Sequence, residues 1–230
     1  MVTRIPTHPL GSGPCMNPNF NYFNHKHRGL YNKTLDILWI DVPKCASTWA
    51  RSFMAQVGGF EPVVADCYPS NCSNVIGVAR DPIQRFISAS MNLSPDLRKC
   101  HSMLETMTSG ELESLVVSRF RDTNLAPQHP HFGHIDISQT QMFWLDKNLT
   151  SNFIKYFQKF GVVIEPKDCP VLNPSEQHDG YYTAIQTIWR KVLKKLPDHH
   201  KALQRAYNLD YQWIQKLQTQ GKFFDNSENT

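Results

Sequence analysis

Short runs of apolar residues alternate with amphipathic segments along most of the chain. Apolar runs flanked by turn residues predict strands near residues 35–41, 63–67, 74–79 and 141–146. Apolar positions at helical spacing predict helices near 47–57, 82–92, 150–160, 180–196, 199–208 and 210–219, and a mostly helical stretch at 94–120 with a break at Thr108-Ser109-Gly110. Strands that alternate with helices favour parallel strands covered on both faces. The sequence therefore predicts an α/β fold, with one domain built on a central, mostly parallel sheet flanked by helices.

The two ends of the chain lack this periodicity. Residues 1–34 contain several Pro, Asn, Gly and His residues and predict an irregular N-terminal arm. Residues 35–220 carry the alternating elements, and 221–230 are expected to form a C-terminal tail. At 230 residues, the chain is long enough for one such domain with its own core.

Residues 37–53 combine an apolar strand, a tight turn and the start of a helix. Unpaired backbone N–H groups and the helix dipole make such a helix start a site for an anion. The GxxxxGK[ST] pattern of nucleotide-phosphate loops is absent, and the turn contains no glycine. We therefore expect an anion site of another kind. Its residues are Pro43, Lys44, Cys45, Ala46, Ser47, Thr48 and Trp49.

A second junction of strand and helix follows the apolar run 74–79. Asp81 is a typical helix cap and Pro82 suits the first helical position. Arg80, at the end of the strand, and Ser88, two turns into the helix, could both reach one phosphate. This junction predicts a second anion site.

Three charged side chains fall at the expected carboxyl ends of strands, namely Lys44, Asp66 and Arg80. In open α/β sheets, ligands bind at that edge. Right-handed crossovers bring the ends of successive parallel strands to the same edge. The pattern therefore predicts one site that collects these side chains.

Together, the two junctions resemble PAPS-dependent sulfotransferases, and within them the carbohydrate sulfotransferase branch. In that family a Pro-Lys-x-[Gly/Ala]-[Ser/Thr/Cys]-Thr loop holds the 5′-phosphosulfate of PAPS (3′-phosphoadenosine 5′-phosphosulfate), as residues 43–49 would here. An Arg and a Ser separated by seven residues hold the 3′-phosphate, which is the spacing of Arg80 and Ser88. The resemblance covers about residues 36–215 in order and implies a P-loop-like sulfotransferase fold.

Other segments extend the resemblance. Ala126-Pro127-Gln128 is similar to the family's Pro-Gln element, and residues 141–146 to its following strand. Leu172-Asn173-Pro174-Ser175 is similar to a family loop near the cofactor, which implies a cofactor-binding role for Asn173 and Ser175. The segment Tyr207-Asn208-Leu209-Asp210-Tyr211 is similar to the family's closing Tyr-x-x-Asp-[Tyr/Phe] helix signature.

The resemblance implies transfer of a sulfuryl group from PAPS to a hydroxyl or an amine, with a carbohydrate as the preferred acceptor. Adenosine 3′,5′-bisphosphate would be the second product, and no metal would be required. Lys44 would neutralise the bridging oxygen of the leaving phosphate as the S–O bond breaks. Ser47, Thr48 and the loop amides would hold phosphate and sulfonate oxygens, and Arg80 with Ser88 would hold the 3′-phosphate.

The catalytic base is less clearly marked. The family normally has a Glu or a His on or just after the second strand, where this chain offers only Glu61 and Asp66. It often has a His three residues before the proline of the Pro-Gln element, where this chain has Asn124. Asp66 has the expected position but an ordinary pKa of about 3.9. His129 has a more suitable pKa but lies just after the Pro-Gln element. Position favours Asp66 as the base, with His129 as the second candidate.

Composition limits the other partners. The net charge of +4 and the absence of a polybasic run argue against nucleic acid, but a mildly basic chain suits anionic substrates. No run approaches the about 18 apolar residues of a membrane span, and residues 1–6 have no apolar signal core. The expectation is a cytoplasmic chain without a membrane span, unless an anchor lies outside this sequence.

Neither the cysteines nor the histidines predict a metal site. The six cysteines contain no CxxC pair and are expected to be free thiols, although Cys67 and Cys72 could bridge across a turn. Cys45 is interpreted as a packing residue. Histidines 129, 131 and 134 share one loop but lack an acidic or thiol partner at helical spacing, so we expect them in the acceptor cleft or in solvent.

Three alternative functions remain open from the sequence. A nucleotide or adenylyl-sulfate kinase would use a similar strand, loop and helix, but would need a glycine-rich loop and a magnesium-binding acid. A non-catalytic protein with a sulfotransferase-like fold would bind a nucleotide or a glycan without turnover. A purely structural interaction protein would bind no nucleotide.

Overall fold

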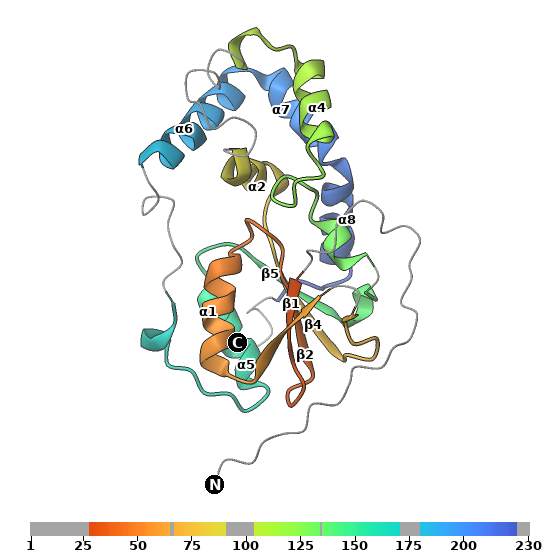
Figure 1. The fold of residues 1–230 in the computed structure, drawn as a ribbon, viewed down its shortest axis with the longest axis vertical. Coiled ribbons are helices and arrows are strands. Elements are labelled where there is room, and N and C mark those ends of the chain that lie inside the picture. Colours follow the sequence, from red (N-terminus) through yellow and green to blue (C-terminus); the bar gives the residue numbers. More distant parts are fainter. Residues whose placement is uncertain (1–27, 65–66, 91–103, 134, 171–179, 225–230) are drawn as a thin grey trace.

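The computed structural model describes residues 28–64, 67–90, 104–133, 135–170 and 180–224 (Figure 1). Its centre is one five-stranded sheet with the order β3-β1-β2-β4-β5. β2 and β4 are parallel, as are β4 and β5, whereas β1 is antiparallel to both β2 and β3. The predicted α/β class is confirmed, but the sheet is mixed rather than mostly parallel in its pairing. The strands are β1 (Arg28–Asn32), β2 (Ile37–Ile40), β3 (Phe60–Val64), β4 (Asn74–Ala79) and β5 (Thr140–Trp144).

Strand β1 corrects the prediction of an irregular arm that extends to residue 34. Its partners are β2 and β3, so the sheet begins at Arg28. The turn after β1 is closed by Asn32, whose Oδ1 accepts hydrogen bonds from the amides of Thr34 and Leu35, both at 3.0 Å. The five residues of β1 are too few for a clear period, and pairing on both edges supplies the backbone hydrogen bonds that fix the strand.

The helices agree closely with those predicted. The break at Thr108-Ser109-Gly110 is a helix start, because Thr108 and Glu111 form a capping box there. Residues 91–103, which belong to the predicted helical stretch 94–120, lie outside the described residues. The α-helices are α1 (Ser47–Val57), α2 (Pro82–Ala89), α4 (Ser109–Ser118), α5 (Leu149–Gln158), α6 (Gly180–Lys195), α7 (Pro197–Ala206) and α8 (Asn208–Thr219). Short 3₁₀ helices are η4 (His129–Phe132), η5 (Ile137–Gln139) and η6 (Pro166–Asp168).

Two hydrophobic clusters hold these elements together. In the first, α1 and α5 pack on one side of the sheet through aromatic rings, and the ring centroids of Phe53 and Phe153 are 5.3 Å apart. On β4, a Cβ atom at Gly77 would come within 2.4 Å of the Phe132 ring, so η4 can approach the sheet only because residue 77 is a glycine. Helix α8 lies on the side of the sheet opposite α1 (Figure 1).

The second cluster is helical and lies beyond the carboxyl ends of β2 and β4. It includes residues of α2, α4, α6 and α7, which gather at the upper end of Figure 1. Phe86 of α2 meets Trp189 of α6 edge to face, with ring centroids 4.7 Å apart.

The C-terminal tail is predicted from residue 221, but the structure pairs residues 222–224 with β5. The amide of Met142 donates to Lys222 O at 2.8 Å, and the amide of Phe224 donates to Met142 O at 2.8 Å. Phe223 stacks on Trp144 at 4.6 Å. None of the helices in the described ranges is long and apolar enough to cross a bilayer.

Candidate functional site

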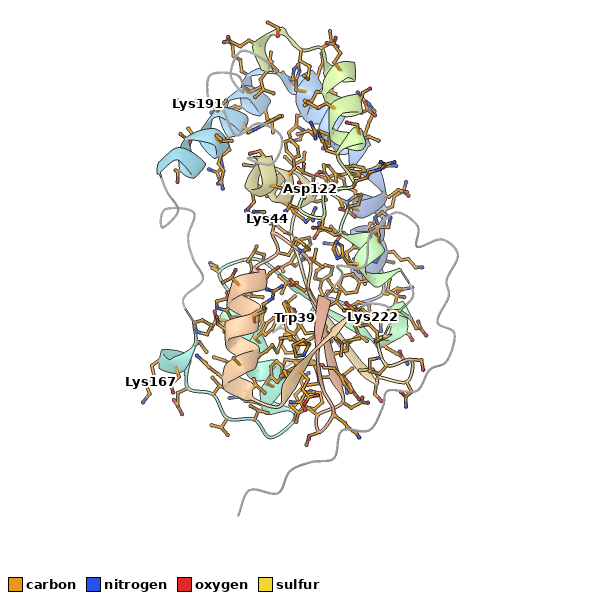
Figure 2. The ribbon with its side chains drawn as sticks, in the orientation of Figure 1. Trp39, Lys44, Asp122, Lys167, Lys191 and Lys222 are labelled. Atoms are coloured by element: carbon orange, nitrogen blue, oxygen red, sulfur yellow. The ribbon has the colours of Figure 1, made fainter. Side chains whose placement is uncertain are left out.

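The loop between β2 and α1 has an unusual backbone. Lys44 and Ala46 have positive φ angles, 65° and 58°, which L-residues other than glycine seldom adopt. The loop is tightened by a hydrogen bond from the amide of Cys45 to Val42 O at 3.1 Å. Successive amides in left-handed turns of this kind can form a concave site for an anion. Figure 2 shows Lys44 at this loop, between the sheet and α2.

The start of α1 has several backbone N–H groups without a partner among the described residues. The first hydrogen bond of the helix runs from the amide of Ala50 to Ala46 O at 2.9 Å, and the helix has no side-chain cap and no acidic residue in its first turn. Within the described ranges, the amides of residues 47–49 have no acceptor. This end of the helix therefore presents several N–H groups and the positive end of its dipole.

Some side chains of the loop bind the main chain of the protein, and others are exposed to solvent. The Ser47 hydroxyl donates to Val42 O at 2.9 Å, so in this conformation its oxygen can accept but its hydrogen is already used. Thr48 is exposed. Trp49 is buried and its indole N–H donates to Pro170 O at 2.7 Å, which ties the helix to a distant segment. Pro43 contributes a carbonyl that accepts a hydrogen bond from Arg85.

Cys45 lies inside the loop with its side chain buried. Its Sγ donates to Oε1 of Gln128 at 3.2 Å. Burial raises the pKa of this thiol to about 11, although the nearby Arg85 and Arg80 charges oppose the shift. A thiol that stays protonated at neutral pH is a poor nucleophile, which agrees with a packing role. Cys45, Cys67, Cys72 and Cys169 are free thiols, as predicted.

Arg80 connects the two predicted anion sites. Its Nη1 donates to Lys44 O at 3.2 Å, so two residues 36 positions apart meet at one edge of the sheet. Its main chain is held by Gln128, whose Oε1 accepts from Arg80 N at 3.1 Å and whose Nε2 donates to Arg80 O at 2.7 Å. Ser88 lies two turns into α2 and is partly buried.

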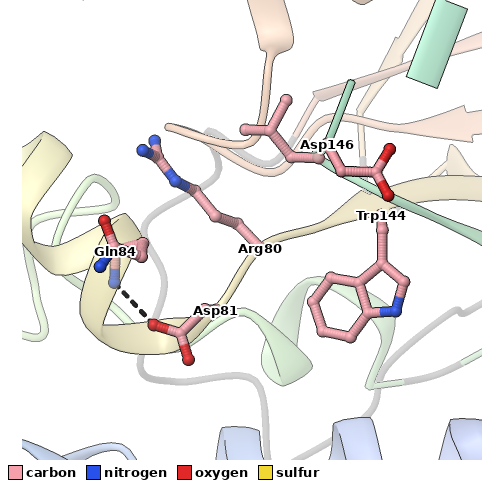
Figure 3. A pocket seen from close by; sticks show the side chains of 6 residues that line it. Arg80, Asp81, Gln84, Trp144 and Asp146 are labelled. Atoms are coloured by element: carbon pink, nitrogen blue, oxygen red, sulfur yellow. Dashed lines mark hydrogen bonds between the residues drawn. The ribbon is translucent and has the colours of Figure 1, made fainter. Parts of the chain in front are cut away.

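A pocket of about 420 Å³ lies beside Arg80, at the carboxyl ends of β4 and β5. Figure 3 shows Arg80 between the start of α2, with Asp81 and Gln84, and the segment that carries Trp144 and Asp146. Asp81 caps α2 through a hydrogen bond from Gln84 N at 2.9 Å. The lining thus combines one cation, two carboxylates and an aromatic ring. Such a pocket can receive a ligand that carries an anionic group together with a ring or hydrogen-bond donors.

Arg85 is a buried part of the site that the sequence did not indicate. Its side chain is fully buried, and its guanidinium donates to Pro43 O at 2.9 Å, to Thr123 O at 3.1 Å and to Ala126 O. It therefore fastens the loop before α1 to the segment before η4. An arginine in an amphipathic helix is expected on the solvent side, so no local signal marked it.

A fully buried carboxylate, Asp210, organises the segment after Pro127. Its oxygens accept from the amide of Gln128, at 2.8 Å each, and from the amide of His129 at 2.9 Å. The Nδ1 atom of His129 lies 2.9 Å from Asp210 Oδ1. The sequence marked Asp210 as part of a helix signature but assigned it no partner.

The structure does not describe all of the predicted site residues. Asp66, Asn173 and Ser175 lie outside the described residues, so their predicted roles remain predictions. Asp41, at the end of β2, was missed: it is buried and forms an ion pair with Arg51. Its proximity to the site loop could have been noticed, because it precedes Lys44 by only three residues.

The described part of the chain contains no group of three His, Cys, Asp or Glu residues able to hold a metal ion. Within η4, His131 is buried, whereas His129 contacts Asp210. Chemically, the site can therefore offer an anion loop with Lys44, an arginine bonded to the main chain of that loop, and one histidine with a carboxylate partner. In comparisons with family models, curated proteins and solved structures, nothing matches this chain.

Proposed function

We propose that the protein is a PAPS-dependent sulfotransferase that transfers the sulfuryl group to a hydroxyl or an amine, with a carbohydrate as the preferred acceptor class. The observation that carries the proposal is the hydrogen bond between Arg80 and Lys44 O, which joins the two predicted anion sites. PAPS carries two anionic groups on one ribose, and a protein that binds it needs two neighbouring cationic sites.

The loop before α1 supports the 5′ side of this proposal. Its open amides and Lys44 suit a phosphosulfate, because backbone N–H groups and a helix N-terminus stabilise an anion without a metal ion. Lys44 would neutralise the leaving phosphate oxygen as the S–O bond breaks. Thr48 is exposed at the start of α1 and would contribute a further hydroxyl.

The pocket beside Arg80 supports the nucleoside side. Its volume of about 420 Å³ lies in the range of small-molecule sites. Arg80 would pair with the 3′-phosphate, with Ser88 as a second donor from α2. Trp144 and the carboxylates of Asp81 and Asp146 offer a ring surface and acceptors for the amino group of a base.

The kinase alternative has less support from the loop. Its two left-handed positions carry Lys44 and Ala46 instead of glycines, and the GxxxxGK[ST] pattern is absent. A nucleotide-binding protein without turnover would share the whole nucleotide site and differ only at the acceptor, so turnover must decide between them.

Two measurements test the proposal. Thermal unfolding with adenosine 3′,5′-bisphosphate should raise the melting temperature more than AMP does, since only the former carries the 3′-phosphate; ligand at ~100 times its Kd stabilises by about 2.7 kcal/mol. Incubation with ³⁵S-labelled PAPS and a panel of sugars, alcohols, amines and tyrosine peptides should then label one class. Equal shifts for both nucleotides would refute the 3′-phosphate site, and binding without labelling would indicate the non-catalytic alternative.

A further inference from the structure

The strongest cluster of ionisable groups outside the nucleotide site is the pair Asp210 and His129. Asp210 is fully buried, on the first turn of α8, and His129 begins η4 with its side chain 28% exposed. Their side chains meet at 2.9 Å between Oδ1 and Nδ1. A buried carboxylate is an acceptor, so the hydrogen in this contact belongs to Nδ1. The neutral ring then has its lone pair on Nε2.

The position of His129 is fixed as well as its tautomer. Its own amide and that of Gln128 also donate to Asp210, so three hydrogen bonds from this segment converge on one carboxylate. The Nε2 atom has no hydrogen-bond partner among the residues described. An imidazole held through Nδ1, with Nε2 available, has the arrangement that a general base needs.

The segment also lies against the nucleotide site. The side chain of Gln128 contacts the thiol of Cys45 inside the anion loop at 3.2 Å and the main chain of Arg80 at 2.7 and 3.1 Å. His129 is the next residue, about 3.8 Å away from Cα to Cα. Asp210 therefore holds the histidine beside the loop to which we assign the phosphosulfate.

We propose that His129 is the base for the sulfuryl acceptor and that Asp210 is its positioning residue, an inference that rests on the proposed function. The Nε2 atom of His129 takes the proton of the acceptor hydroxyl or amine while the acceptor's oxygen or nitrogen forms a bond to sulfur. The bond between sulfur and the bridging oxygen breaks, and that oxygen keeps the electron pair as part of adenosine 3′,5′-bisphosphate. The imidazolium formed opposite Asp210 later returns its proton to water. The sequence alone favoured Asp66 for this role.

Two measurements distinguish the positioning role of Asp210 from a purely structural role. Long-range ¹H–¹⁵N spectra of the intact protein, assigned with His129→Asn, should show His129 protonated on Nδ1 near neutral pH, and Asp210→Asn should change that tautomer population. This readout needs no turnover. A ring protonated on Nε2 in the wild type would overturn the proposal.

The second readout is turnover with labelled PAPS. His129→Ala and His129→Asn should lower kcat by roughly 10²–10⁴-fold and leave the affinity for adenosine 3′,5′-bisphosphate unchanged. Asp210→Asn should lower kcat by about 10²-fold or more by misplacing the proton, but should have no further effect on kcat in a His129→Ala background. Losses that multiply in the double variant, or near-normal turnover in His129→Asn, would overturn the proposal.

Matched controls are His200→Ala and Asp198→Asn on α7, where Asp198 is 80% exposed. Both should behave as wild type, and melting curves identify any variant that fails to fold. Failure of the wild type to bind adenosine 3′,5′-bisphosphate would refute the proposed function, and with it the base role, even if the tautomer is as expected. Binding and turnover that survive the loss of His129 would refute only the base.

Discussion

The guanidinium of Arg80 donates a hydrogen bond to the main-chain carbonyl of Lys44 at 3.2 Å. The contact fixes the spacing between the end of β4 and the loop before α1, two segments that belong to parallel neighbouring strands. The guanidinium of Arg80, at the end of β4, thus supports the main chain of Lys44, which follows β2.

Lys44 and Arg80 should have separable effects. Lys44→Ala should lower kcat by about 10²–10³-fold, because its charge is needed most as the leaving oxygen becomes negative. Arg80→Ala should mainly weaken nucleotide binding. Arg80→Lys should weaken it less, because lysine keeps the positive charge but lacks the planar guanidinium that can donate two parallel hydrogen bonds. Single-turnover kinetics and calorimetric titration measure the two effects, with exposed Lys216→Ala as the control. Near-normal turnover in Lys44→Ala would refute its leaving-group role.

Gln128 should be needed for the integrity of the site. Gln128→Ala removes both hydrogen bonds to the main chain of Arg80 and should lower the free energy of unfolding by about 2 kcal/mol. Urea denaturation measures this change. Gln139→Ala, at an exposed position, should change it by less than about 0.5 kcal/mol. Equal stability of the two variants would show that the contacts with Arg80 contribute little.

Arg85 should be among the most sensitive residues in α2. Arg85→Met leaves the carbonyls of Pro43, Thr123 and Ala126 without their donor, which should cost about 3 kcal/mol or more. Arg190→Met is the matched control, because Arg190 is exposed and, among the described residues, its hydrogen-bond partner is Gln186 of the same helix. If thermal unfolding shows only a small loss of stability for both variants, Arg85 does not hold the two segments together.

Ala46 should tolerate glycine but not a β-branched residue. With φ at 58°, Ala46→Gly relieves backbone strain while adding freedom to the unfolded chain, so stability should change by less than about 1 kcal/mol. Ala46→Val should cost more than Ala55→Val on the exposed side of α1, where only helix propensity changes. Equal costs for the two valines would argue against a left-handed residue 46.

Cys45 should resist alkylation and make stability depend on alkaline pH. With a pKa of about 11, only about a thousandth of this buried thiol is ionised at pH 8, so exposed Cys67 should react first with iodoacetamide. The folded pKa lies above the ordinary value of 9.0, so the folded state holds the proton more tightly. The corresponding stability is present below pH 9 and is lost as the pH rises through 11. Wild type and Cys45→Ala should therefore converge in stability over that range; a constant difference would contradict the shift.

Local sequence signals were sufficient to predict most helices and strands of this protein and the two junctions at its site. Helix α1 begins and ends as predicted, β4 has its predicted bounds, and α2 starts at Pro82 because Asp81 caps it. These features depend on hydrogen bonds and apolar spacing within a few residues, which a linear pattern records. The strand-end position of Lys44 and Arg80 follows from the same short-range signals.

The way in which distant segments meet depends on contacts that exist only in the folded chain. Strand β1 enters the sheet through pairing with β2 and β3, and Arg85 is buried because three carbonyls from two other segments surround it. Asp210 reaches Gln128 and His129 across about 80 positions of sequence. Such contacts leave no local pattern, because burial of a charged side chain is favourable only where the folded chain supplies its hydrogen-bond partners.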